Sequence, residues 1–90
     1  VGMSKYSYKK SVQLDGGYVQ KMDAGEYAVF ADGEHIGYVE KADRDAWRAR
    51  ALIGELTVGV HVDNGWSIFH NTRREATWAI EARRREEVTV

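Results

Sequence analysis

Apolar and polar residues alternate with a period of two along most of the first seventy positions, which is the pattern of half-buried β-strands. The clearest example is 26–31, where Tyr27 and Val29 share one face. Asp32-Gly33 follows, and this dipeptide is a strong signal for a two-residue type I′ turn. Residues 35–41 are therefore predicted to return antiparallel, with Ile36 and Tyr38 on a common face.

The alternation is looser at the N-terminus. Residues 5–14 are predicted to form one strand with a wet face. Asp15-Gly16-Gly17 then forms a turn, because glycine adopts positive φ without steric cost. Residues 18–22 complete this hairpin, and the sequence leaves open whether the first two strands pair within the chain or with a neighbour.

The segment 46–52 has two interpretations. Alanine, arginine and leucine are good helix formers. The alternation of Trp47, Ala49 and Ala51 with Arg48 and Arg50 favours a strand, because a helix would scatter these residues around its circumference. We therefore predict a strand.

A second hairpin is predicted downstream. In 56–62 the inward residues alternate with Thr57, Gly59 and His61; they are Leu56, Val58, Val60 and Val62. Asp63-Asn64-Gly65 is another primed-turn signal. It leads into a short strand over 66–69.

The pattern changes to a helical period after residue 71. Thr72 and Glu75 form a capping box, in which each side chain satisfies a backbone N–H at the helix start. Ala76, Ala79 and Ile80 then form one apolar stripe that must lie on the sheet. A helix from about residue 73 to 87 is predicted.

Together these elements predict a single small α+β domain over residues 3–90, with an antiparallel sheet of hairpins and one C-terminal α-helix packed on one face. Val1 and Gly2, which precede Met3, are expected to be a remnant outside this domain. Residues 3–22 form its N-terminal hairpin.

Composition narrows the setting. The 90 residues include no Cys and no Pro, and the net charge is −1. The lack of thiols fits a reducing compartment, so we expect a cytoplasmic protein. No apolar run is long enough for a membrane span or a signal peptide, and we expect no membrane partner. Near-neutral charge also means that nucleic-acid binding would need a local patch.

Catalytic signals are weak. His61 and Asp63 could hold a metal or orient a base, but a metal site needs three or four ligands, and His35 and His70 are not spaced to supply them. No nucleophile elbow or phosphate-binding glycine loop is present. We expect no enzyme activity, no metal, no cofactor and no small-molecule substrate.

The arginines are a better lead. Arg48 and Arg50 project from one strand face, while Arg73 and Arg74 stand at the helix start, where the helix dipole favours anions. These four are the candidate nucleic-acid-binding residues. The alternative is a solvated surface in which neighbouring carboxylates cancel the charge.

Trp78 is the second lead. It lies about 200° from Ala76 and Ile80 on a helical wheel, with Ala82 on its side, so it cannot share the centre of their stripe. We expect it to pack at the sheet margin. The alternative is exposure to a protein partner, with a homodimer as the natural cover. Trp78 and Ala82 are therefore the candidate protein-interface residues.

The string Trp47-Arg48-Ala49-Arg50, a second hairpin, Phe69 and then Thr72 to Ala76 resembles the arm-type or AP2-like DNA-binding domain of phage integrases. It also resembles short uncharacterised phage proteins of the same layout. The resemblance implies a sheet face that enters the DNA major groove and presents Arg48 and Arg50. The leading hypothesis is thus a non-enzymatic, phage-encoded module that contacts nucleic acid. The alternative is a protein-interaction module that acts on a host or partner protein.

Overall fold

The structure is a computed structural model that describes residues 5–62 and 67–88. Its five-stranded antiparallel sheet has the order β1-β4-β5-β6-β7, and β2 pairs with β3 in a separate two-stranded ladder. The predicted α+β class is confirmed. The elements are β1 (Tyr6–Lys9), β2 (Ser11–Gln13), η1 (Asp15–Gly17), β3 (Val19–Lys21), β4 (Glu26–Ala31), β5 (Glu34–Asp43), β6 (Ala46–Ile53), β7 (Leu56–Val60) and α1 (Arg73–Val88).

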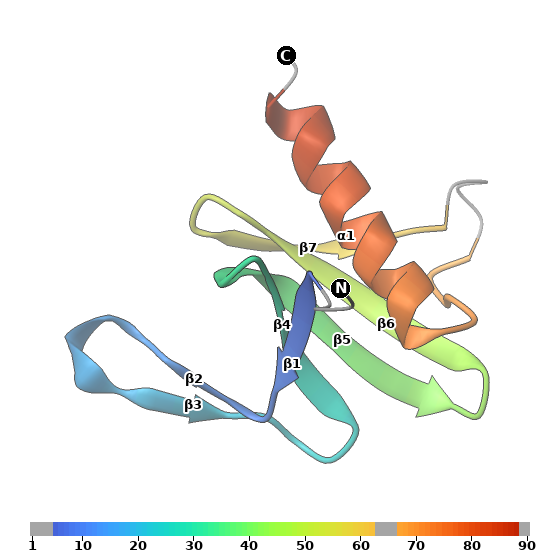
Figure 1. The fold of residues 1–90 in the computed structure, drawn as a ribbon. Coiled ribbons are helices and arrows are strands. Elements are labelled where there is room, and N and C mark those ends of the chain that lie inside the picture. Colours follow the sequence, from blue (N-terminus) through green and yellow to red (C-terminus); the bar gives the residue numbers. More distant parts are fainter. Residues whose placement is uncertain (1–4, 63–66, 89–90) are drawn as a thin grey trace.

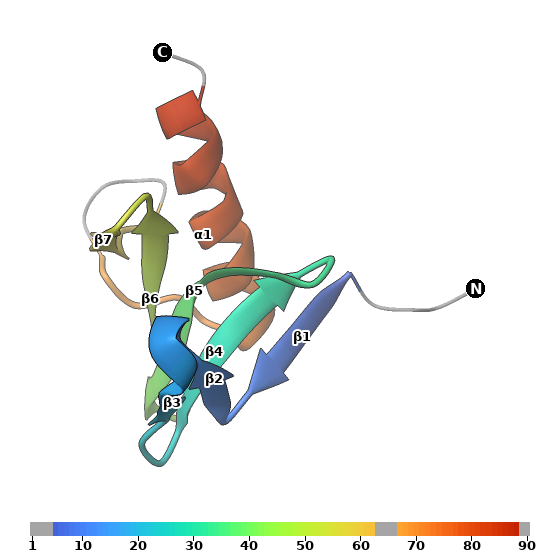
Figure 2. The ribbon, with the colours of Figure 1, turned by 90° about the vertical axis from the view of Figure 1, so that its left-hand side faces the viewer.

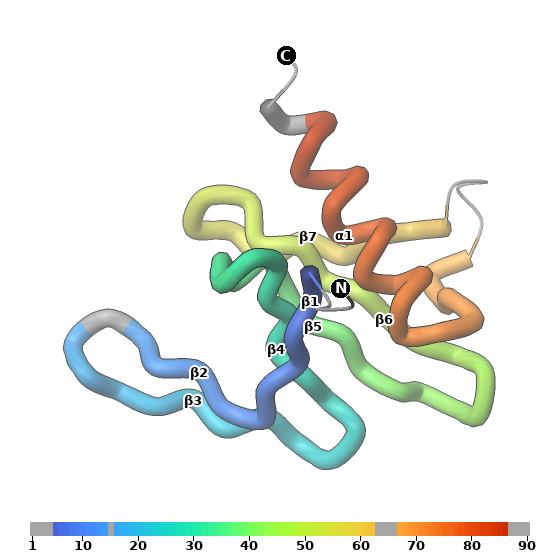
Figure 3. The backbone as a smooth tube through the Cα atoms, in the orientation of Figure 1, coloured from blue at the N-terminus to red at the C-terminus, as the bar shows by residue number. Residues whose placement is uncertain are grey.

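The helix lies across one face of the large sheet and packs mainly on β6, with further contacts to β5 and β7 (Figures 1 and 2). We call the opposite side of the sheet the open face. The β2–β3 hairpin extends from the body as an arm (Figure 3). Its base is buried, where Val12 and Met22 pack against Ala28 on the open face.

The main core is the layer between α1 and the sheet. Ala76 and Ile80 are fully buried there and Ala79 is partly buried, as the predicted stripe requires. Thr72 begins the helix as predicted, since its Oγ1 accepts a hydrogen bond from the Glu75 N–H at 3.0 Å. The sheet contributes small and β-branched residues to this layer: Val29, Ala31, Ile36, Val39, Ala49, Ala51 and Val60.

The segment 46–53 is a strand, not a helix. β6 lies between β5 and β7, so both of its edges are occupied by antiparallel ladders. Trp47, Ala49 and Ala51 face α1, while Arg48 and Arg50 are exposed on the open face. The period of two therefore outweighed the helix propensity of alanine and arginine, because tertiary pairing overrides intrinsic preference.

The β4–β5 hairpin has the predicted turn, with positive φ at Asp32 (50°) and Gly33 (85°). The predicted facing of β5 is wrong, because the register shifts between Val29 and Phe30. A bulge places one extra residue, Ile36, in β5. Ile36 therefore packs in the core on the helix side, whereas Tyr38 lies on the open face.

The N-terminal prediction of one long strand is also wrong. The chain bends at Lys10, so β1 pairs with β4 and β2 pairs with β3. The Lys10 ammonium holds the bend by donating to the carbonyl oxygens of Asp23 (2.8 Å) and Glu26 (2.9 Å). Both N-terminal strands therefore pair within the chain.

The chain after β7 differs from the prediction as well. β7 ends at Val60, and Leu56, expected to face inward, is 67% exposed. The predicted turn at 63–65 and Trp66 lie outside the described residues, and 67–69 form no strand. Instead His70 takes the place beside Trp47, with backbone hydrogen bonds of 2.7 and 2.8 Å in both directions.

A polar seam joins β1 to α1. Thr77 is fully buried, donates to the Arg73 carbonyl oxygen at 2.9 Å, and accepts from the Tyr8 hydroxyl at 2.8 Å. Tyr6 donates to the Glu81 carboxylate, which also forms an ion pair with Lys5 at 2.7 Å. This seam fixes the edge strand against the helix.

Tyr6 provides a pH test of the seam. Burial, aided by the hydrogen bond to Glu81, raises the Tyr6 pKa from 10.0 to about 12. The fold thus favours the neutral phenol, so its contribution to stability is complete below pH 10.0 and is lost as the pH rises towards about 12. We expect the stability of Tyr6→Phe to fall less over this range than that of the native chain, measured by urea unfolding. An equal fall in both proteins would contradict the assignment.

Candidate functional site

The predicted arginine pair of β6 is held on the open face by cross-strand neighbours. Arg48 lies opposite Glu40 in the ladder, with its Nε 3.8 Å from the carboxylate. Arg50 forms an ion pair with Glu26. Each guanidinium also lies over an aromatic ring, Arg48 over Phe69 at 5.8 Å and Arg50 over Tyr38 at 5.2 Å.

The other predicted pair lies on the helix side of the sheet. The Arg73 guanidinium covers the Tyr8 ring at 3.9 Å and the Tyr27 ring at 5.4 Å, and both tyrosines pack against the main core. Arg74 is exposed beside it at the helix start. The four arginines therefore do not form one surface, because the sheet separates Arg48 and Arg50 from Arg73 and Arg74.

An aromatic cluster lies next to Arg50 on the open face. His35 stacks on Phe30 and meets Tyr38 edge-on, each with ring centroids 4.9 Å apart. Burial lowers the pKa of His35, although its Nε2 lies 3.1 Å from the Gly37 carbonyl oxygen. A neutral imidazole in this stack suits packing more than anion binding.

Trp78 and Ala82 line the same groove, which we call the helix groove. It lies between the segment 67–71 and the outer side of α1 and has a volume of about 640 Å³. Trp78 is 51% exposed there, not packed at the sheet margin as expected from the sequence. Phe69, 43% exposed, lines the same groove.

Phe69 is an exposed aromatic residue of the groove that was not among the interface residues predicted from the sequence. It was assigned to a strand, whereas 67–69 are irregular and no periodicity reports their direction. Hydrogen bonds fix this segment: Ser67 Oγ accepts from the Phe69 N–H at 3.0 Å, and the two ladder bonds of His70 tie its end to Trp47. The wall of the groove is therefore anchored to β6.

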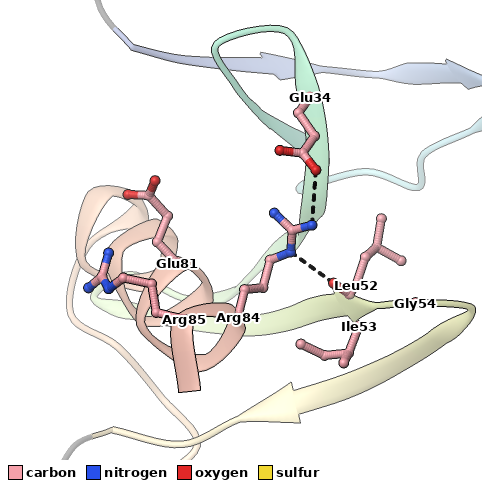
Figure 4. Close-up of a pocket in the computed structure, with 7 residues that line it drawn as sticks. All are labelled: Glu34, Leu52, Ile53, Gly54, Glu81, Arg84 and Arg85. Atoms are coloured by element: carbon pink, nitrogen blue, oxygen red, sulfur yellow. Dashed lines mark hydrogen bonds and ion pairs between the residues drawn. The ribbon is translucent and has the colours of Figure 1, made fainter. Parts of the chain in front are cut away.

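A second cleft, of about 580 Å³, lies between the C-terminal half of α1 and the β4–β5 and β6–β7 turns (Figure 4). Arg84 fills its polar side, donating to the Leu52 carbonyl oxygen (2.9 Å) and the Glu34 carboxylate (3.1 Å). Glu81 stands at the other side, and its pKa is lowered because hydrogen bonds from Lys5 and Tyr6 outweigh the effect of burial. These pairings give the cleft a structural role.

The remaining sequence candidates do not assemble. His61 is exposed, and Asp63 lies outside the described residues. Within residues 5–62 and 67–88, no three His, Asp or Glu side chains are grouped to hold a metal ion. In the same ranges, no helix has both the length and the apolar character needed to cross a bilayer.

Comparison with protein-family models, with curated proteins and with solved structures finds no match to this chain.

Proposed function

We propose that this chain is a protein-binding module that uses the helix groove. The observation that carries the proposal is that Trp78 and Phe69, each about half exposed, line the two walls of one groove. Large apolar side chains that are grouped and exposed mark protein-interaction sites, and aromatic residues carry much of the binding energy at such sites.

The groove also has the composition of an interface. Its floor is made by small residues of the helix, Ala79 and Ala82, so a partner side chain can approach the backbone closely. Charged residues, Glu75 and Arg85, lie along its length at the rim. An apolar centre with a polar rim is the usual anatomy of a specific protein interface.

Selection of peptides on the native chain tests this proposal. A displayed peptide library is selected on the native protein alone, and the affinity of each selected peptide is then measured for the native chain and for Trp78→Ser. We expect binders with an apolar anchor that lose at least about tenfold in affinity on Trp78→Ser, because a central aromatic residue carries much of the binding energy. Binders that ignore this substitution would contradict the proposal.

Leu56→Ser is the matched control. Leu56 is more exposed than Trp78, at 67%, but lies on β7 outside the groove lining. It should leave peptide affinity unchanged. Thermal melts of both variants verify that each is folded, so that a loss of binding is not due to unfolding.

Nucleic-acid binding through the open face is a second candidate function. The observation that favours it is the adjacency of Arg48 and Arg50, each guanidinium beside an aromatic ring. Stacking rings with neighbouring cations can bind single strands. Glu26 and Glu40 oppose it, since they pair with these arginines.

Fluorescence anisotropy with single- and double-stranded oligonucleotides decides this candidate. If Arg48 and Arg50 each contact one phosphate of duplex DNA, a plot of log affinity against log salt concentration has a slope of about −1.8. The double variant Arg48→Ala/Arg50→Ala should abolish this binding. Arg73→Ala/Arg74→Ala, on the other side of the sheet, is the control. Absence of binding at low salt rules the candidate out.

A further inference from the structure

Four side chains form a stripe on the outward side of α1. Two copies of this stripe that run in opposite directions would match each other in charge and in size. Glu75, Trp78, Ala82 and Arg85 follow one another at helical spacing, on the side away from buried Ile80. All four line the helix groove. In the reversed order of the stripe, the basic Arg85 takes the position of the acidic Glu75. The small Ala82 likewise exchanges positions with the large Trp78.

We propose that the helix groove binds a second copy of this chain in an antiparallel, twofold-symmetric dimer. This inference rests on the protein-binding function proposed above and names its partner. A twofold axis perpendicular to α1 and level with Ile80 brings residues equally far before and after Ile80 to the same height. Trp78 then packs beside the partner's Ala82, and Glu75 lies level with the partner's Arg85, each contact occurring twice.

Shape supports this register. Trp78 is 51% exposed and presents a large apolar surface, whereas Ala82 leaves room above the helix backbone. A large residue beside a small one lets two helices approach closely and fill the space between them. The opposite order of the two residues in an antiparallel partner makes both halves of the contact equivalent.

Charge selects the same orientation. In a parallel dimer Glu75 would face its own copy and Arg85 its own copy, and like charges repel. The antiparallel register replaces both repulsions with attractions. Arg85 also lies beside Glu81 of its own chain (Figure 4), and a guanidinium has five N–H donors with which to serve two carboxylates.

The expected dimer is weak. One helical stripe and the adjoining loop wall make a small interface, at or below the lower end of the range for stable complexes. Dissociation in the micromolar range is therefore expected, so the test must reach high protein concentration.

Sedimentation equilibrium of the full chain, from low micromolar to near-millimolar concentration, tests the dimer. We expect a monomer–dimer equilibrium that Trp78→Ser weakens by at least about tenfold. Arg85→Glu and Glu75→Arg should each weaken it by about tenfold, because each creates two like-charge contacts. The double variant Glu75→Arg/Arg85→Glu should return to within about threefold of the native constant.

Controls separate dimerisation from folding. The charge variants place unfavourable charges at the helix ends, so circular-dichroism melts at low concentration verify that each monomer is folded. Leu56→Ser, outside the groove, should dimerise like the native chain. Charge variants that fold but show no recovery in the double variant would overturn the register.

The remaining outcomes distinguish this inference from the function on which it rests. A native chain that stays monomeric throughout, while selected peptides still bind in a Trp78-dependent way, overturns the dimer and leaves the groove function standing. A dimer insensitive to Trp78→Ser, for example one formed through the β1 or β7 edges, also overturns it. A native chain that neither self-associates nor binds any selected peptide overturns both proposals.

Discussion

Gly37→Ala is expected to destabilise the fold by about 3 kcal/mol or more, because it adds a methyl group where the structure has no space for one. A Cβ at this position would lie 2.2 Å from the Arg50 carbonyl oxygen, a backbone atom held by the β5–β6 ladder. The same Cβ would lie 3.2 Å from Ile80 Cδ1. Relief therefore requires that β5 and β6 separate at this point and that the Ile80 side chain also moves.

Gly59→Ala is the matched control for this experiment. Gly59 is also a strand glycine, but a Cβ there meets nothing within 4 Å. Alanine at this position should be neutral or slightly stabilising, since it restricts the unfolded chain. Urea unfolding followed by circular dichroism measures both variants. Equal stability of the two would show that the close approach at Gly37 does not limit the fold.

Ile80→Ala is expected to cost about 2 to 5 kcal/mol, as for other large-to-small changes at closed sites. Ile80 is fully buried at the centre of the helix–sheet layer, and the bulge in β5 aims Ile36 into the same layer. The buried cluster to which Ile80 belongs takes residues from β4, β5, β6 and β7, so the truncation leaves a cavity inside the main core. For a domain of this size the loss corresponds to a fall of about 10 °C or more in melting temperature.

Ile68→Ala provides the comparison for Ile80. Ile68 is 41% exposed on the segment after β7, so the same truncation there should change stability by no more than about 0.5 kcal/mol. Differential scanning calorimetry gives both melting temperatures. A small effect at Ile80 would mean that α1 does not depend on this contact for its position.

The elements that were predicted correctly are those that depend on a few neighbouring residues in the sequence. Asp32-Gly33 specifies its turn through φ alone, and Thr72 specifies the helix start through one hydrogen bond. The facing of β5 was wrong because a bulge adds a residue that no sequence period announces. The break at Lys10 was missed because a tertiary contact to two carbonyl groups causes it.

The candidate site shows the same division. The sequence identified Arg48 and Arg50 as neighbours because a strand places alternate residues on one face. It could not tell that Arg73 lies on the other side, since that depends on which sheet face the helix covers. It selected Trp78 and Ala82 from the helical wheel, but the groove also needs Phe69, whose direction is set by an irregular segment.

The contact between Arg48 and Phe69 has a further implication for how this protein responds to ligands. Arg48 stands on one surface and Phe69 on another, yet the guanidinium lies over the ring at 5.8 Å from its centre, so the two surfaces have a shared boundary. A ligand that draws the guanidinium away would change the environment of the ring, and occupancy at the ring would alter the freedom of the guanidinium. Thermodynamic linkage makes such an influence equal in both directions, so affinity at either surface would depend on whether the other is occupied.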